Sequence, residues 1–221
     1  MRFRLLLLIF LCTLCSCSTQ RENTFEENLA ICTNKLGHFP KGIDTTSIEG
    51  ANAKLHFQEQ IREFMKGSIG PNFKVQTYTG DSIITAPMQN KAVVLFFWLA
   101  TLDDAPAVFK KSDLASFAAM NALCRKYNQS VNFIGFPFND SSTVRRHLQA
   151  HPLNFPQVYD DKITSDKHIE LTQNGTPCVI FVNTQGRVVK ISSGNPTSAS
   201  LIIETYSPII QACIDNKPYS K

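Results

Sequence analysis

The side chains with the clearest capacity for chemistry in this sequence are its cysteines. Three of the seven belong to the first twenty residues: Cys12, Cys15 and Cys17. The other four are widely spaced: Cys32, Cys124, Cys178 and Cys213. None of the four forms a Cys-x-x-Cys pair or has a histidine at the spacing of a tetrahedral zinc site. We therefore expect no metal and no other cofactor, and thiol chemistry stays open only for individual cysteines.

The first segment, MRFRLLLLIFLCTLCSCSTQ, has the composition of an export signal. Arg2 and Arg4 precede an apolar block over residues 5–14, which is shorter than the ~20 residues of a membrane-spanning helix. The residues before Cys17 resemble a bacterial lipobox, although Cys15 is unusual at its second position. We expect residues 1–17 to be a lipoprotein signal peptide with lipid on Cys17; cleavage by ordinary signal peptidase, or a short anchor, is the alternative.

An exported, lipid-anchored chain belongs to the cell envelope, on the inner or outer membrane and facing the periplasm or the surface. Thiols in that compartment can stay oxidised, so a disulfide is chemically possible. The composition supports one domain with a small N-terminal extension, because 221 residues with 43% hydrophobic content and 16 phenylalanines suffice for one buried core. The net charge of +4 is spread without basic runs, which excludes a nucleic-acid partner.

Two aspartates form the second chemically notable group. Asp103 and Asp104 follow the apolar run AVVLFFW and stand just before Pro106. Such a run is typical of a strand buried on both faces of a sheet. A helix N-terminus has unpaired N–H groups and favours negative charge, so either aspartate, with Pro106 in the first turn, can begin the next helix.

The mature chain alternates between strand-like and helix-like segments. Residues 18–50 are polar and mixed, which predicts a tether with a short helix over residues 25–32. A helix follows over residues 51–66, with an apolar face formed by Leu55, Ile61, Phe64 and Met65. The segment TYTGD predicts a hairpin turn at Gly80 between short strands. A helix over residues 113–127 and the strand VNFIGFPF then complete a right-handed parallel crossover.

The second half of the chain continues the alternation. Ser141 or Ser142 is expected to cap a helix that ends at Ala150. The segment NTQG predicts an antiparallel hairpin, and an amphipathic helix with a kink at Pro208 follows over residues 199–214. Its apolar face is Leu201, Ile202, Tyr206, Ile209, Ile210 and Cys213. This order predicts an α/β fold with a mixed central sheet flanked by helices.

Four motifs in this order resemble the thioredoxin fold, and within it the TlpA and redoxin-type lipoproteins common in Bacteroidetes. They are IGPNFKVQTYTGDSI, KAVVLFFW, NFPQVYDD and GTPCVIFVNTQGRVV, and the resemblance as a whole covers about residues 69–216. The resemblance implies a thioredoxin-like domain over residues 67–217, preceded by a tether and helical extension over residues 18–66. It also implies that the family's Cys-x-x-Cys motif should begin a helix shortly after Trp98.

That motif is missing here. Aligned without gaps, Leu102 and Ala105 occupy the two cysteine positions, with Asp103 and Asp104 between them. In the family, the first cysteine is a thiolate because the helix N-terminus lowers its pKa. A carboxylate can cap a helix, but it cannot exchange disulfides. The peroxiredoxin-like, copper-binding and glutathione-peroxidase-like sites of related families lack their required residues as well.

The resemblance leaves several candidates for a binding groove. Pro177 matches the family's cis-proline, whose loop presents backbone groups to extended peptides. The full set is Trp98, Asp103, Asp104, Thr176, Pro177 and Cys178. Each has a simpler structural explanation: Trp98 can pack under the turn, Pro177 can begin a strand, and Cys178 can be a small core residue.

The remaining thiols and the histidines have their own expectations. Cys124 and Cys213 lie on apolar helix faces, which predicts core packing. Cys32 lies in the expected tether, so a link to another protein or to Cys178 is an alternative. The five histidines have polar neighbours and are expected at the surface: His38, His56, His147, His151 and His168.

The sequence therefore predicts a thioredoxin-like envelope lipoprotein without dithiol chemistry, acting as a binding or accessory module. Its partner would be an extended peptide or another envelope protein, besides the membrane reached by its lipid. The alternatives are a thiol-disulfide oxidoreductase that acts through Cys178 or Cys32, and an accessory protein whose fold is only a spacer.

Overall fold

A four-stranded mixed sheet forms the centre of the molecule. The structure, a computed structural model, describes residues 22–100, 106–159, 178–194 and 197–219. The strand order is β4-β3-β5-β6. Strand β3 (Ala92–Trp98) pairs in parallel with β4 (Val131–Pro137) and antiparallel with β5 (Cys178–Val182), which pairs antiparallel with β6 (Val188–Ser193). The predicted crossover and C-terminal hairpin are both confirmed.

Strand β3 is buried on both faces, as its continuous apolar run predicts. Val94, Phe96 and Trp98 belong to one core cluster, and Val93, Leu95 and Phe97 belong to the other. Successive side chains of a strand point to opposite faces, so one strand supplies both cores. The burial of β3 on both faces fixes the position at which the chain leaves the sheet after Trp98.

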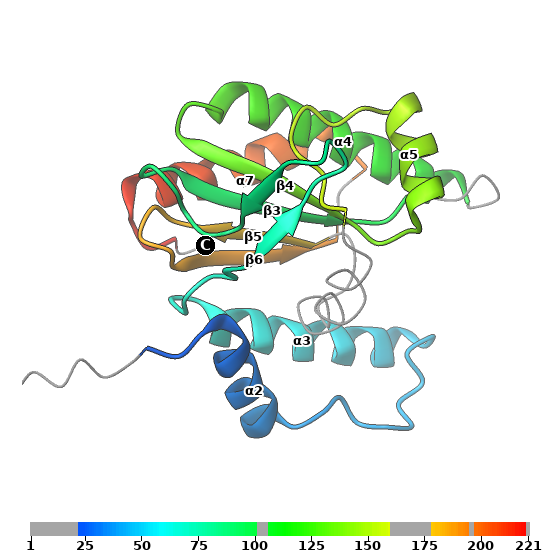
Figure 1. The fold of residues 1–221 in the computed structure, drawn as a ribbon. Coiled ribbons are helices and arrows are strands. Elements are labelled where there is room, and N and C mark those ends of the chain that lie inside the picture. Colours follow the sequence, from blue (N-terminus) through cyan, green and yellow to red (C-terminus); the bar gives the residue numbers. More distant parts are fainter. Residues whose placement is uncertain (1–21, 101–105, 160–177, 195–196, 220–221) are drawn as a thin grey trace, which may run out of the picture.

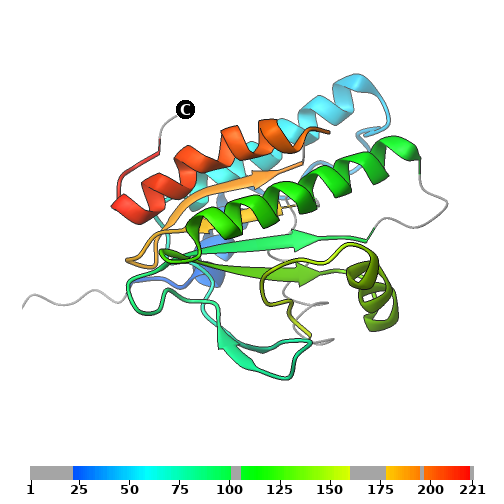
Figure 2. The same cartoon turned by 90° about the horizontal axis from the view of Figure 1, so that it is seen from above.

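Two long helices cover one face of the sheet. Helices α4 (Ala107–Tyr127) and α7 (Ala199–Asp215) lie side by side on that face (Figures 1 and 2). Each turns a row of apolar residues spaced three and four apart toward the sheet, such as Phe117, Met120 and Cys124 on α4. Helix α4 begins at Ala107 rather than at residue 113, and Leu201 of α7 is exposed, so these two predictions are wrong.

The N-terminal helices cover the opposite face (Figure 1). Helix α2 (Phe25–Leu36) begins with a capping box between Thr24 and Glu27 and buries Phe25, Leu29 and Cys32. Helix α3 (Ile48–Met65) buries Ile61 and Met65. Leu55 is exposed, in contrast to the predicted apolar face, whereas Ile61 and Met65 near the end of α3 are buried.

A short hairpin extends the sheet beyond β4. Strands β1 (Lys74–Gln76) and β2 (Ser82–Ile84) pair antiparallel around Gly80, whose φ of 89° suits the turn. The segment 157–159 joins this hairpin to β4, through bridges from Thr77 to Val158 and from Gly135 to Gln157. The predicted hairpin is confirmed, and Gln157 and Val158 add two isolated β-bridges that the sequence did not predict.

Helix α5 (Ser141–Ala150) follows β4. Its N-cap is Asp140, whose Oδ1 accepts hydrogen bonds from the N–H groups of Ser142 and Thr143. The expected serine cap is therefore wrong, because the carboxylate one residue earlier reaches both amides. Among the described residues, the helices are too short or too polar to cross a membrane.

Candidate functional site

The end of β3 is held in place by the chain that follows β4. The N–H of Phe138 donates to the carbonyl oxygen of Trp98 at 2.9 Å. The side chain of Asn139 accepts a hydrogen bond from the N–H of Ala100 and donates to its carbonyl oxygen. Both backbone groups of Ala100 are thereby satisfied. The chain thus leaves the sheet at a fixed point, directly before residues 101–105.

Trp98 lies under this point and does not line an open groove. Its side chain is buried, and its indole Nε1–H donates to Oε1 of Gln157 at 2.9 Å. Gln157 is also buried, and its Nε2 donates to the carbonyl oxygen of Phe155. The expectation that Trp98 contacts a ligand is corrected, because the Gln157 hydrogen bond and the edge of Phe117 occupy its surroundings.

Gln157 needs the glycine opposite it. A Cβ at position 135 would lie 2.0 Å from Oε1 of Gln157, closer than atoms can approach. Gly135 therefore leaves the space in which the Gln157 amide reaches Trp98. The glycine in the strand VNFIGFPF has a packing role that only the tertiary structure shows.

His147 packs against the rings of Trp98 and Phe117. Its ring centroid lies 5.7 Å from that of Trp98 and 5.1 Å from that of Phe117. Its Nε2 is buried and has no hydrogen-bond partner. Burial, with a smaller contribution from His151, lowers the pKa of His147. The prediction that all five histidines lie at the surface is therefore wrong for His147.

The start of helix α4 differs from the expected arrangement. Pro106 is the N-cap, no side chain caps it, and the first turn holds no acidic residue. Pro106 was expected inside the first turn, so that prediction is off by one position. Leu102, Asp103, Asp104 and Ala105 lie outside the described residues.

Apolar side chains are exposed on both sides of residues 101–105. Val108 and Phe109, in the first turn of α4, are 56% and 59% exposed, and Leu99, just after β3, is 46% exposed. Exposed apolar side chains that gather in one region often mark an interaction site. Their position at the start of α4 makes this end of the sheet a candidate contact surface.

The four cysteines of the described chain are free and buried. Burial raises the pKa of every one of these thiols, to about 12 for Cys178 and Cys213. Cys32 lies in the core between α2 and the sheet, so its placement in an exposed tether is corrected. The expected core packing of Cys124 and Cys213 is confirmed.

One charged side chain, Arg62, affects the pKa of Cys178. The guanidinium of Arg62 lowers its pKa, but burial has the larger effect. Arg62 is held by Glu59 and by Oγ of Ser193, which stands opposite Cys178 in the β5–β6 pair. Because the thiol is fully buried, Cys178 does not line a groove, which corrects that candidate. Thr176, Pro177 and the lipidation candidate Cys17 belong to stretches that the structure does not describe.

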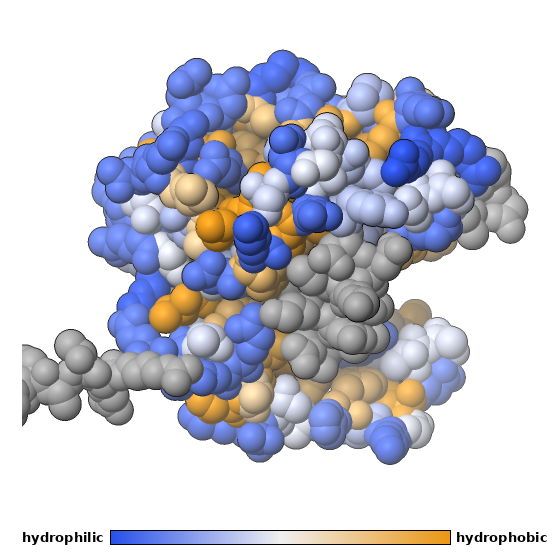
Figure 3. All heavy atoms as spheres, in the orientation of Figure 1, coloured by the Kyte–Doolittle hydropathy of each residue, from blue (hydrophilic) through white to orange (hydrophobic). Residues whose placement is uncertain are grey.

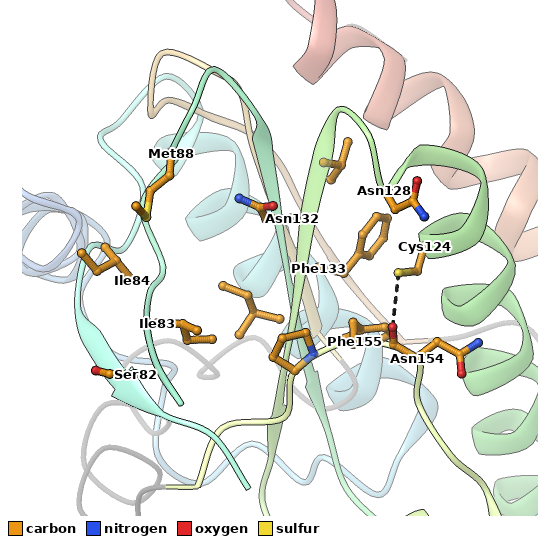
Figure 4. A pocket seen from close by; sticks show the side chains of 13 residues that line it. Ser82, Ile83, Ile84, Met88, Cys124, Asn128, Asn132, Phe133, Asn154 and Phe155 are labelled. Atoms are coloured by element: carbon orange, nitrogen blue, oxygen red, sulfur yellow. Dashed lines mark hydrogen bonds between the residues drawn. The ribbon is translucent and has the colours of Figure 1, made fainter. Parts of the chain in front are cut away.

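A groove that the sequence did not predict lies beside β4. It has a volume of about 440 Å³, and its walls come from β4, the β2 region and the segment before Gln157 (Figure 4). Asn132, a polar residue inside an apolar strand, was the one available signal, because it suits the edge of a sheet rather than its middle. Within the described ranges, no group of three or more histidine, cysteine or acidic residues is arranged to hold a metal.

No protein-family model matches the sequence, and no curated protein matches it either. Solved structures do match. A protein of Chlorobium tepidum, assigned as a thiol:disulfide interchange protein DsbE, superposes with a TM-score of 0.55 at 19% identity, over 67% of this chain and 97% of that one. The C-terminal domain of a protein assigned as a thiol-disulfide oxidoreductase of Bacteroides thetaiotaomicron gives 0.53 at 15% identity, over 68% and 97%.

The fold is thioredoxin-like. A second Chlorobium tepidum protein, a thiol:disulfide interchange protein of the thioredoxin family, agrees with a TM-score of 0.52 at 13% identity, over 67% of this chain and 97% of that one. The structural relatives of this chain are thus thiol-disulfide oxidoreductases of the DsbE and TlpA type. At these identities the similarity shows the fold alone. It does not assign the activity of the relatives to this chain.

Proposed function

We propose that this protein is a redox-inactive binding or accessory module with a thioredoxin-like fold, anchored to the cell envelope by a lipid on Cys17. One observation carries the proposal. The four cysteines after the leader are buried thiols with raised pKa values, and the positions of the family's dithiol hold Leu102 and Ala105. Disulfide exchange needs an accessible thiolate, which such thiols do not supply at neutral pH.

The apolar end of the sheet supports a binding role. Leu99, Val108 and Phe109 are exposed directly before and after positions 101–105, where the family resemblance places the dithiol. In this proposal Asp103, Asp104, Thr176 and Pro177 complete the surface. Its ligand is an extended peptide or another envelope protein, held by apolar contact rather than by a mixed disulfide.

The redox test compares the full chain with a restored variant. We expect the native protein to reduce insulin disulfides no faster than buffer with dithiothreitol. The double variant Leu102→Cys with Ala105→Cys is expected to accelerate the reaction, because it returns a Cys-x-x-Cys pair to the scaffold position. The single variant Leu102→Cys is the matched control, since one thiol cannot complete the exchange.

Mass-resolved alkylation across a glutathione redox ladder provides the second readout. We expect the four thiols to react only after unfolding, since burial blocks both the reagent and ionisation. A disulfide or glutathione adduct at Cys178 or Cys32, titrating within roughly −180 to −300 mV, would instead establish the oxidoreductase alternative.

A further inference from the structure

Strand β4 is at the edge of the central sheet, and only part of its outer edge is covered. The N–H of Gly135 donates to the carbonyl oxygen of Pro156, and the N–H of Val158 donates to the carbonyl oxygen of Gly135, both at 2.8 Å. Backbone groups along a strand alternate between its two sides, so those of Val131 and Phe133 point outward like those of Gly135. Among the described residues, no hydrogen bond pairs these outward groups.

The groove of about 440 Å³ lies directly beside this uncovered half. The β4 residues that line it are Val131, Asn132, Phe133 and Ile134. Asn132 lies on the side of Ile83, Ile84 and Met88, whereas Phe133 lies on the side of Cys124 and Asn128 (Figure 4). Phe155 and Pro156 close the end where the covered half of the edge begins. None of the described lining residues carries a charge. On the face of the molecule shown in Figure 3, exposed apolar residues lie between polar ones.

We propose that this groove binds an extended, uncharged peptide segment of a partner protein, which adds a strand to the free edge of β4. Unpaired donors and acceptors at every second residue match the hydrogen-bonding pattern of an extended chain. The segment 156–158 already pairs with Gly135 in parallel, so this edge accepts a strand in the adjacent register. The neutral lining favours apolar or uncharged side chains on the guest, because a charge would lose its water there.

The wall opposite β4 determines whether the groove can hold a single extended strand or the sheet edge of a folded partner. Ile83, Ile84 and Met88 stand across the groove from the edge. A second copy of this chain would have to bring its own β4 together with its own copy of that wall. A single extended segment has no such obstacle, so a peptide is the occupant that fits.

This site is separate from the surface of the proposed function. Val131 stands opposite Ala92 at the start of β3, whereas the exposed apolar end follows Trp98, which stands opposite Pro137. Six residues of strand at ~3.3 Å each separate the two ends by about 20 Å. Loss of one site therefore leaves the other intact, and the two proposals can fail independently.

Amide hydrogen exchange of the full chain, read by NMR, tests the proposal. The probes are blocked, uncharged heptapeptides with Val, Ile, Leu or Phe at alternate positions and Thr or Ser between them. In the free protein we expect the Val131 and Phe133 amides to exchange fast and the Asn132 and Ile134 amides slowly. A bound peptide should slow exchange at Val131 and Phe133 by about tenfold or more, and its alternately N-methylated counterpart should not.

Two surface variants complete the test. Ile84→Glu places a charge in the groove and is expected to weaken peptide binding about tenfold or more. Ile48→Glu, at the exposed first position of α3, is the matched control and should bind normally. The proposal is overturned if no peptide of the set binds below about 1 mM, or if the N-methylated peptides bind equally well. Dimerisation that protects Val131 and Phe133 without peptide would also overturn it, because a second copy would then be the occupant.

Discussion

At the scale of single residues, two buried side chains, Trp98 and Gln157, and the half-buried His147 organise the region beneath the end of β3. Trp98 and Gln157 satisfy each other, since the indole donates and the amide accepts. His147 packs against the same tryptophan without a partner for its Nε2. A buried, unpaired ring nitrogen is tolerable when the ring is neutral and becomes costly when it is protonated.

This difference makes folding stability depend on pH through His147. Burial lowers its pKa in the folded state, so the unfolded chain binds the proton more readily. Stability should therefore be greatest above the unfolded pKa of about 6.5 and should fall as the pH drops below it. Urea denaturation at pH 7.5 and pH 5 should show a smaller loss for His147→Phe than for the native chain. Arg146→Gln, on the same helix, should keep the native loss; an unchanged loss in His147→Phe would contradict the assignment.

At the scale of elements, helix α7 combines a well-buried face with a local defect. Ile202, Tyr206 and Ile209 face the core, whereas Pro208 lies on the exposed side within the helix. Proline has no N–H, so the carbonyl oxygen of Glu204 lacks its usual helical donor. Burial of the apolar face offsets this defect.

Restoring the donor should stabilise the protein. We expect Pro208→Ala to raise the free energy of unfolding by about 1 to 3 kcal/mol, because alanine supplies the N–H and is the better helix former. Chemical denaturation measures the change, and the exposed control Glu204→Ala should stay within about 0.5 kcal/mol of the native protein. A destabilised Pro208→Ala variant would show that the bend itself is needed to pack α7.

At the scale of the whole molecule, the sheet needs helices on both faces. One core lies under α4 and α7, and the other is closed by α2 and α3. Phe25 of α2 belongs to the second core although it lies more than sixty positions before β3. The N-terminal helices are thus part of the folded unit.

Truncation of Phe25 should therefore destabilise the entire protein. We expect Phe25→Ala to cost about 3 to 5 kcal/mol, because it leaves a cavity at a position that is 2% exposed. Ile48→Ala on the exposed part of α3 should change stability by less than about 0.5 kcal/mol. Fluorescence of Trp98 and circular dichroism should report one common transition. Two separate transitions, with only the first moved by Phe25→Ala, would mean that α2 folds on its own.

The sequence by itself determined the elements and their order. The strand AVVLFFW, the turn at Gly80, the parallel crossover and the C-terminal hairpin were all predicted, because alternation, helical periodicity and turn residues are local properties. The absence of cysteines at positions 102 and 105 is likewise readable directly. The boundaries were predicted less well: the cap of α5 depends on which nearby side chain reaches the free amides, and α4 begins without a side-chain cap.

Only the tertiary structure decided which candidates are buried and where a ligand can enter. Trp98, Cys32 and Cys178 proved to be core residues because segments distant in sequence, such as Gln157 and α3, cover them. The groove beside β4 arises where residues 82–88, 131–134 and 154–156 meet, and no single segment contains its pattern. Burial and concavity are properties of chain segments brought together, so they follow from packing and not from local sequence.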